Sequence, residues 1–284
     1  MGILYMLLAS GCFATMSAFI KAIGQSLPLP ELVFLRCLLS LPVLFLFVRL
    51  RQRPLLVKAK KILLLRTLFG MTAMSGFFFA LTHIPFAECI FLGRTQPFII
   101  ALLSPIILGE KTPVVSWFAI ISGLGGVALI MQPGVSWSVG AWVAIGAAGF
   151  SALAHILVRR LNATEYPLVI VFNFTLLTCF FAALWSLPYF VLPTHAQWLF
   201  LFCIALFASL GQLCMTLAYQ HDRAPAVASA SYTSVVLAVV YGYFIWGEVP
   251  HPLTWLGGGL IVAGGILLLR SRLHVNEPPS PAAT

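Results

Sequence analysis

The chain is a succession of long apolar stretches separated by short polar links. Ten such stretches lie at roughly 3–22, 29–48, 62–82, 85–108, 113–131, 138–158, 166–190, 196–219, 224–246 and 252–270. A helix needs about 20 apolar residues to cross a hydrocarbon core about 30 Å thick. The apolarity is continuous rather than alternating, which excludes a transmembrane β-barrel. We predict an all-α integral membrane protein of ten transmembrane helices, with little mass outside the bilayer.

The fourth stretch contains residues that oppose its apolar pattern. Arg94 lies roughly 14 Å from the start of this stretch, near the bilayer midplane. An arginine there costs about 2.5–3.5 kcal/mol on insertion scales, so its side chain should face the interior of the bundle. Pro97 cannot donate a hydrogen bond to the Gly93 carbonyl, and Gly93 permits a bend. We therefore expect a broken helix beside Arg94 and Gln96.

Composition and charge support a membrane protein and predict its orientation. Hydrophobic residues make up 61% of the chain and charged residues 8%, against about 25% charged in soluble domains. The net charge of +9 does not indicate nucleic-acid binding, because most Lys and Arg residues fall in alternate links and after the last stretch. By the positive-inside rule, both termini and the basic loop 49–61 are cytoplasmic. The Pro-rich tail 274–284 is expected to be disordered.

An internal repeat links the two halves of the sequence. Gly109 and Glu110 reappear as Gly247 and Glu248, at an offset of 138 residues. At that offset further identities occur, and at 137 in the earlier stretches: His83 with His221, Thr95 with Thr233, Trp117 with Trp255, Gly126 with Gly264, Phe13 with Phe150 and Pro30 with Pro167. The pattern predicts two five-helix repeats, 1–134 and 135–273. Because five is odd, the second repeat should be inverted, an arrangement typical of secondary transporters.

These features resemble the EamA family of the drug/metabolite transporter superfamily. The resemblance covers about 3–270 and rests on the ten stretches, the duplicated unit, Pro97 and the two Gly-Glu pairs. It implies export of amino acids and other small metabolites, with import in some members. Val235 stands where the counterpart of Pro97 is expected, which puts a matching kink in the ninth stretch in doubt.

Several polar and aromatic residues are candidates for contact with a solute. Arg94 either pairs with protein groups or attracts a substrate carboxylate or phosphate. Its counterpart Tyr232, within "ASASYTS", either packs between helices or faces Arg94 across a cavity. We also assign Gln96, Phe79 and Glu88 to substrate binding, with an apolar surface beside the charge suited to an amphipathic organic solute.

Other residues are assigned structural roles. Gly93 and Pro97 form the break, while Gly109, Glu110, Gly247 and Glu248 are structural or gating positions. Each glutamate caps the helix that follows it or neutralises a neighbouring terminus, rather than binding an ion. We expect structural pairing for Arg36, and Arg66 is close enough to the cytoplasmic end to reach the interface.

The sequence favours a transporter over the other classes of membrane protein. It lacks paired membrane aspartates, HExxH and a channel filter motif, so we expect no enzyme, no metal and no cofactor. The partners are a small-molecule substrate and membrane lipid, and the oligomeric state stays open. We predict an inner-membrane secondary transporter that exports amphipathic metabolites such as amino acids by alternating access. An importer or exchanger of the same fold is the alternative, with a channel or scaffold less favoured.

Overall fold

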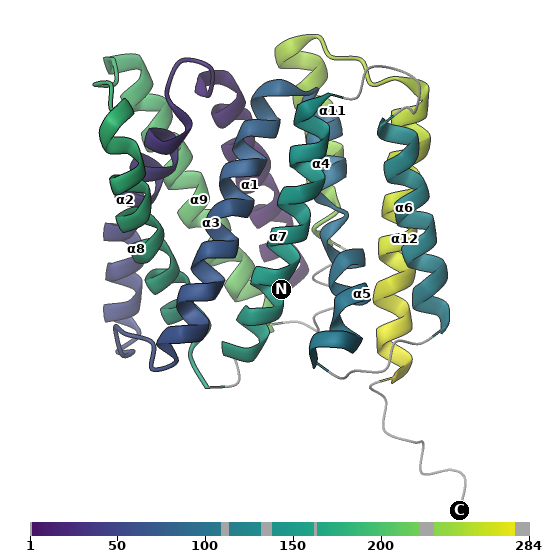
Figure 1. Cartoon of the computed structure of the whole chain (residues 1–284), viewed down its shortest axis with the longest axis horizontal. Helices are drawn as coiled ribbons and strands as arrows, with labels where there is room; N and C mark the ends of the chain where they lie inside the picture. The colour runs from purple at the N-terminus through teal and green to yellow at the C-terminus, as the bar shows by residue number, and fades with distance from the viewer. Residues whose placement is uncertain (1, 109–113, 132–137, 162–163, 222–229, 276–284) are drawn as a thin grey trace, which may run out of the picture.

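The computed structural model describes residues 2–108, 114–131, 138–161, 164–221 and 230–275, and these residues contain helices but no strand. Eight helical segments are long and apolar enough to cross a membrane, and they correspond to the first eight predicted stretches. The ninth and tenth stretches contain the shorter apolar helices Thr233–Trp246 and Pro252–Leu268. Figure 1 shows the helices standing side by side.

The helices have the following bounds: α1 Gly2–Ile23, α2 Leu29–Leu50, α3 Lys60–His83, α4 Phe86–Gly93, α5 Gln96–Leu108, α6 Val114–Met131, α7 Val139–Leu161, α8 Pro167–Ser186, α9 His195–His221, α11 Thr233–Trp246 and α12 Pro252–Val275, with a 3₁₀ turn η1 at Leu187–Tyr189. Helices α2 and α8 both carry a proline in their first turn. Proline suits that position because its missing N–H would have no partner inside the helix.

The fourth stretch is interrupted, with α4 ending at Gly93 and α5 beginning at Gln96. The chain turns at Arg94 and Thr95, and the Thr95 hydroxyl donates to the Leu92 carbonyl at 2.7 Å. This hydroxyl gives the carbonyl a partner where the helical ladder stops. The break therefore lies where the sequence predicts it.

The ninth stretch is also interrupted, although it lacks the proline. The chain turns at Ser231 and Tyr232 before α11 begins at Thr233. The Ser231 carbonyl accepts hydrogen bonds from the Ser234 hydroxyl at 3.0 Å and from Arg94 Nη2, also at 3.0 Å. Side chains thus satisfy a carbonyl at this turn as well. Our doubt about a matching break, which rested on Val235, was wrong, because the chain turns at Ser231 and Tyr232 without a proline.

Four helix pairs form the most extensive contacts, namely α1 with α9, α3 with α7, α2 with α8, and α6 with α12. In each pair, one helix precedes residue 135 and the other follows it. The α2–α8 and α6–α12 pairs stand at opposite ends of the bundle in Figure 1, with α1, α3, α4, α7 and α11 between them. The centre of the bundle is therefore built from both halves of the chain.

Glycines bring α6 and α12 into backbone contact. A Cβ added to Gly126 would lie 2.4 Å from the Gly257 carbonyl oxygen, and one added to Gly257 would lie equally close to the Gly126 oxygen. A Cβ on Gly264 would lie 2.8 Å from the Ala119 oxygen. The 138-residue offset relates Ala119 to Gly257 and Gly126 to Gly264. The repeat therefore maps the contact between Gly126 and Gly257 onto the contact between Ala119 and Gly264. Small residues permit this close packing of membrane helices.

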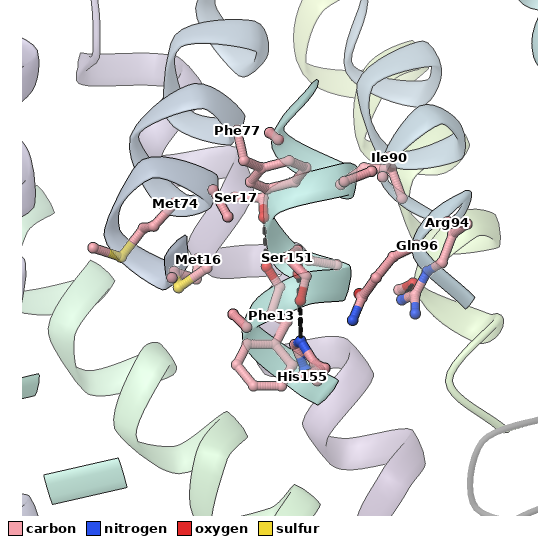
Figure 2. A pocket seen from close by; sticks show the side chains of 18 of the residues that line it. Phe13, Met16, Ser17, Met74, Phe77, Ile90, Arg94, Gln96, Ser151 and His155 are labelled. Carbon is pink, nitrogen blue, oxygen red and sulfur yellow. Dashed lines mark hydrogen bonds between the residues drawn. The ribbon is translucent and has the colours of Figure 1, made fainter. Parts of the chain in front are cut away.

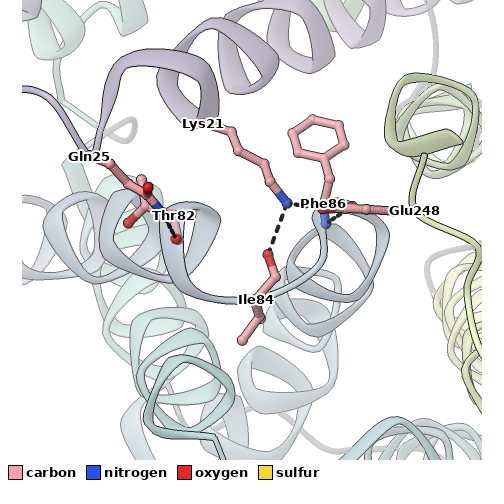
Figure 3. Close-up of polar contacts among 6 residues, drawn as sticks. All are labelled: Lys21, Gln25, Thr82, Ile84, Phe86 and Glu248. Carbon is pink, nitrogen blue, oxygen red and sulfur yellow. Dashed lines mark hydrogen bonds and ion pairs between the residues drawn. The ribbon is translucent and has the colours of Figure 1, made fainter. Parts of the chain in front are cut away.

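Glu248 joins three helices at one face of the bundle, which we call the Lys21 face (Figure 3). Its Oε2 accepts the backbone N–H of Phe86, the first residue of α4, at 2.6 Å, and its Oε1 pairs with Lys21 at the end of α1. Lys21 also donates to the Ile84 carbonyl at 3.1 Å. Gly247 has a φ of 65°, a left-handed conformation that ends α11 and turns the chain toward these partners. A carboxylate is favoured at a helix N-terminus because of the helix dipole. Gly109 and Glu110 lie outside the described residues.

We predict that Gly257→Ala destabilises the protein, whereas Gly259→Ala does not. The added methyl group of Gly257→Ala meets a backbone oxygen that cannot move aside, and overpacking of this kind costs about 1–3 kcal/mol. At Gly259 nothing lies within 4 Å of the added atom, so alanine there should be neutral or slightly stabilising. Thermal unfolding of the purified variants in detergent measures the difference. Equal Tm values for both variants would contradict the packing described.

We further predict that Lys21→Met and Glu248→Gln do not act independently on stability. The two side chains are only 11% and 23% exposed, and removing one partner leaves the other charge poorly solvated. A double-mutant cycle followed by thermal unfolding should give a coupling of about 0.5–3 kcal/mol. Strict additivity would mean that the ion pair contributes nothing.

Candidate functional site

A cavity of about 350 Å³ lies in the middle of the bundle. Its lining comes from α1, α2, α3, α4 and α5 of the first half and from α7, α8 and α11 of the second. The lining is mostly apolar, with a few polar groups that include three arginines. Figure 2 shows Arg94 and Gln96 together on one side of the cavity, opposite Phe13 and Met74. This volume falls within the range of small-molecule sites, about 300–1,000 Å³.

Arg94 lines the cavity from the break between α4 and α5. Its Nη1 donates to the Ser231 hydroxyl at 3.3 Å, and its Nη2 donates to the Ser231 carbonyl at 3.0 Å and to the Ser234 hydroxyl. The guanidinium therefore ties the two helix breaks together and also borders the hollow space. The sequence left protein pairing and solute binding as alternatives, and the surroundings of Arg94 include both protein partners and open space.

The predicted residues Gly93 and Gln96 also line the cavity, whereas Pro97 is not among its described lining residues. A Cβ on Gly93 would lie 3.3 Å from the Phe77 ring, so the glycine lets this ring approach the break. Phe77, on α3, contributes apolar surface beside Arg94. The cavity thus combines a cation with an aromatic ring.

Three residues assigned to substrate binding lie elsewhere. Phe79 lines a second, apolar hollow bordered by α2, α3, α7 and α8, and it stacks on His83 with ring centroids 3.8 Å apart. Tyr232 lies 5.9 Å from the Arg94 guanidinium, but its hydroxyl occupies the space that a side chain at Gly265 would need. Glu88 accepts a hydrogen bond from Thr254 at 3.3 Å. None of the three is among the described lining residues of the central cavity. Phe79 does not line the central cavity because residues two positions apart on a helix point in different directions, so Phe79 points away from the face that carries Phe77.

Sequence reasoning missed two arginines and a histidine of the cavity. Arg36 on α2 and Arg66 on α3 both line it, although we expected structural pairing for the first and interfacial contact for the second. Their presence within apolar stretches was the available signal, because each carries the insertion cost discussed for Arg94. His155 on α7 also lines the cavity, and the sequence predicted no role for it.

The geometry around His155 does not suit nucleophilic catalysis by the neighbouring serine. His155 Nδ1 lies 2.8 Å from the Ser151 carbonyl oxygen and 3.5 Å from the Ser151 hydroxyl. Because a carbonyl oxygen only accepts, Nδ1 carries the proton and cannot take one from that hydroxyl. Within the described part of the chain, no three His, Cys, Asp or Glu side chains gather as a metal site would require.

Comparison with known proteins agrees with a transporter. The pseudopaline exporter CntI of Pseudomonas aeruginosa is 34% identical over 277 residues, which are 95% of this chain and 96% of that protein. The riboflavin transporter of Vibrio cholerae is 28% identical over 202 residues, covering 70% and 68% of the two chains. Human solute carrier family 35 member G1 is 27% identical over 288 residues, covering 92% and 76%.

A solved crystal structure shares the fold, with a TM-score of 0.69 and 18% identity over 97% of this chain and 99% of that one. The EamA-like transporter family model matches this chain twice, at residues 1–132 and 138–270. These matches cover nearly the whole sequence, and with the apolar helices they identify a transmembrane protein related to transporters of small molecules. The chain belongs to the EamA-like transporter family.

Proposed function

We propose that the protein is a secondary transporter that exports small amphipathic metabolites bearing a carboxylate, such as amino acids, across the bacterial inner membrane. The central cavity supports this proposal, because the Arg94 guanidinium and the Phe77 ring both line it within the apolar bundle. Such a site offers an anion partner and an apolar surface to one solute. The name of the Pseudomonas relative, an exporter, supports the direction of transport.

The mechanism that fits this cavity is alternating access between two inverted repeats, 1–134 and 135–273. The contacts that the 138-residue offset exchanges between α6 and α12 support this arrangement, as does the crossed pairing of α1 with α9 and α3 with α7. Ser122 provides a further sign, since its hydroxyl donates at 3.1 Å to the carbonyl of its own counterpart, Leu260. Halves related in this way can rock about a site between them.

The Lys21 face is then the external face, with both termini in the cytoplasm. The basic loop 49–61 lies between α2 and α3, at the ends of those helices remote from Lys21, and cytoplasmic loops carry the excess of Lys and Arg. Glu248 links α11 to α1 and α4 on the external face. Release of a solute to the outside requires these contacts to separate.

A resistance screen identifies the solute, and counterflow tests carrier transport. Cells that overexpress the protein are exposed to a panel of metabolites at toxic concentrations, because an exporter lowers the toxicity of its own substrate. The purified protein in proteoliposomes should then exchange the labelled solute for the unlabelled one. Flux without exchange would indicate a pore and overturn the alternating-access mechanism.

We expect Arg94→Ala to reduce flux of the identified solute by at least tenfold, because a hydrogen bond to a charged group contributes about 1.5–3 kcal/mol. Ser231→Ala is the matched control, since it removes a side-chain partner of Arg94 but keeps the charge and the backbone carbonyl. Initial rates in proteoliposomes are compared at equal amounts of folded protein. Near-normal flux through Arg94→Ala would remove the assigned role, and equal losses in both variants would make that role structural.

Phe77→Leu and Phe79→Leu form a second pair of variants. We expect the first to raise the KM for an aromatic or apolar solute several-fold, because Phe77 borders the central cavity, and the second to leave KM nearly unchanged. The two substitutions remove the same atoms from the same helix, so a general loss of packing would affect both. A larger effect at Phe79 would place the solute in the second hollow, which Phe79 lines, instead.

A further inference from the structure

The central cavity contains three arginines and, among its described lining residues, no acidic side chain. Arg36, Arg66 and Arg94 come from three different elements. The four glutamates that the structure describes bond elsewhere. Glu31 accepts from the Val191 backbone, Glu88 from Thr254, Glu165 from the Lys58 backbone and Glu248 from Lys21 and Phe86. The positive charge of the cavity therefore has no described carboxylate beside it.

Arg36 reaches the cavity from α2 with few polar contacts. Its guanidinium lies 5.7 Å from the centroid of the Phe78 ring, and its Nη1 donates to the sulfur of Met74. A thioether sulfur is a weak acceptor. The Nε of Arg36 is buried and has no hydrogen-bond partner among the described residues. These contacts hold the side chain in place but satisfy little of its donor capacity.

The side chain of Arg66, on α3, stacks on an aromatic ring, and a nearby glycine leaves room for it. Its guanidinium carbon lies 3.5 Å from the centroid of the Phe174 ring on α8. A Cβ on Gly70, one turn further along α3, would lie 2.6 Å from Nη1 of Arg66 and 2.9 Å from that ring. Gly70 thus provides the space in which arginine and phenylalanine stack. Nε and Nη1 of Arg66 are buried, and the described part of the protein offers them no acceptor.

Unsatisfied guanidinium donors in an apolar bundle are costly. Each buried donor without a partner costs about 1–3 kcal/mol, and more when it is charged. A guanidinium offers a planar fork of donors whose shape matches a carboxylate or a phosphate. Arg94 already donates to Ser231 and Ser234, whereas Arg36 and Arg66 retain buried donors. Their natural complement is an anionic group that enters with the solute.

We infer that Arg36 and Arg66 form a second anion-binding subsite, so that the transported solute carries at least two acidic groups. One acidic group binds at Arg94, a second binds at Arg36 and Arg66, and the apolar part of the solute lies against Phe13 and Phe77. This inference rests on the proposed transport function and narrows its substrate class from amphipathic acids in general to amphipathic polyacids.

The test compares pairs of probes that differ by one carboxylate. N-acetylphenylalanine has one carboxylate, and N-succinylphenylalanine has two with the same aromatic group; acetylated and succinylated leucine and alanine extend the series. Binding to the purified full-length protein in detergent is measured by thermal stabilisation over a range of probe concentrations. We expect the wild type to bind the two-acid member of at least one pair about tenfold or more tightly, as one charge-assisted contact allows.

Variants assign this preference to the subsite. Arg66→Gln and Arg36→Gln should abolish the preference for the two-acid probe and leave one-acid binding within about twofold. Arg94→Gln should weaken both probes. Gly70→Ala keeps all three arginines but occupies the space beside Arg66, so it should reduce the same preference without a change of charge. Arg49→Gln, whose guanidinium lies against Phe45 at 5.3 Å and outside the cavity lining, is the matched control.

Each outcome decides between the two proposals. Equal binding of both members in every pair, or an equal loss of both probes in Arg66→Gln and Arg36→Gln, overturns the second subsite. Counterflow of a solute with one acidic group or none also overturns it, and leaves the transport function standing. Absence of counterflow for the solute identified by the resistance screen contradicts the transport function, whether or not the polyacids bind. If no probe binds at all, the polyacid inference fails.

Discussion

The arrangement of this protein depends on how arginines are accommodated inside an apolar helical bundle. A guanidinium cannot lose its proton in a protein, so it needs acceptors, aromatic surface or a hydrated space wherever it lies. Arg94 finds acceptors at the start of α11, Arg66 finds the Phe174 ring, and Arg36 finds the Phe78 ring. All three also border the same cavity. The three charges thus converge on the hollow centre from different parts of the first half of the chain.

The two helix breaks show how this need shapes the backbone. At the first break, proline and glycine weaken the helical hydrogen bonding, and the Thr95 hydroxyl donates a hydrogen bond to the Leu92 carbonyl. At the second, without proline, Ser234 and Arg94 serve the Ser231 carbonyl. Exposed backbone at membrane depth is tolerated where protein groups or a cavity satisfy it. Each break is therefore stabilised by its side chains, and Arg94 belongs to both.

The order of apolar stretches and the break at Gly93–Pro97 could be predicted from the sequence, because each depends on local composition or on a local backbone property. The partners of Glu248 could not, because Lys21 and Phe86 are distant in the sequence. Which residues line the cavity was harder to predict from the sequence. Phe77 and Phe79 are the same residue type in the same apolar stretch, so the sequence does not distinguish them. The rotation of α3 about its axis decides that Phe77 faces the central cavity and Phe79 the second hollow. Arg36 and Arg66 appeared separate because they lie on different helices, and tertiary packing brings them together. The helix break at Ser231 depends partly on a donor 137 residues away, which no local pattern records.

The bonds from Arg94 to Ser231 and Ser234 have a consequence for how tightly any solute is held. An incoming carboxylate has to compete with acceptors that are already in place, so binding is an exchange of one set of partners for another. The net affinity then reflects a difference between two similar interactions rather than the full strength of an ionic contact. A protein that must let go of its cargo in every cycle benefits from such a small difference, because tight capture would slow turnover.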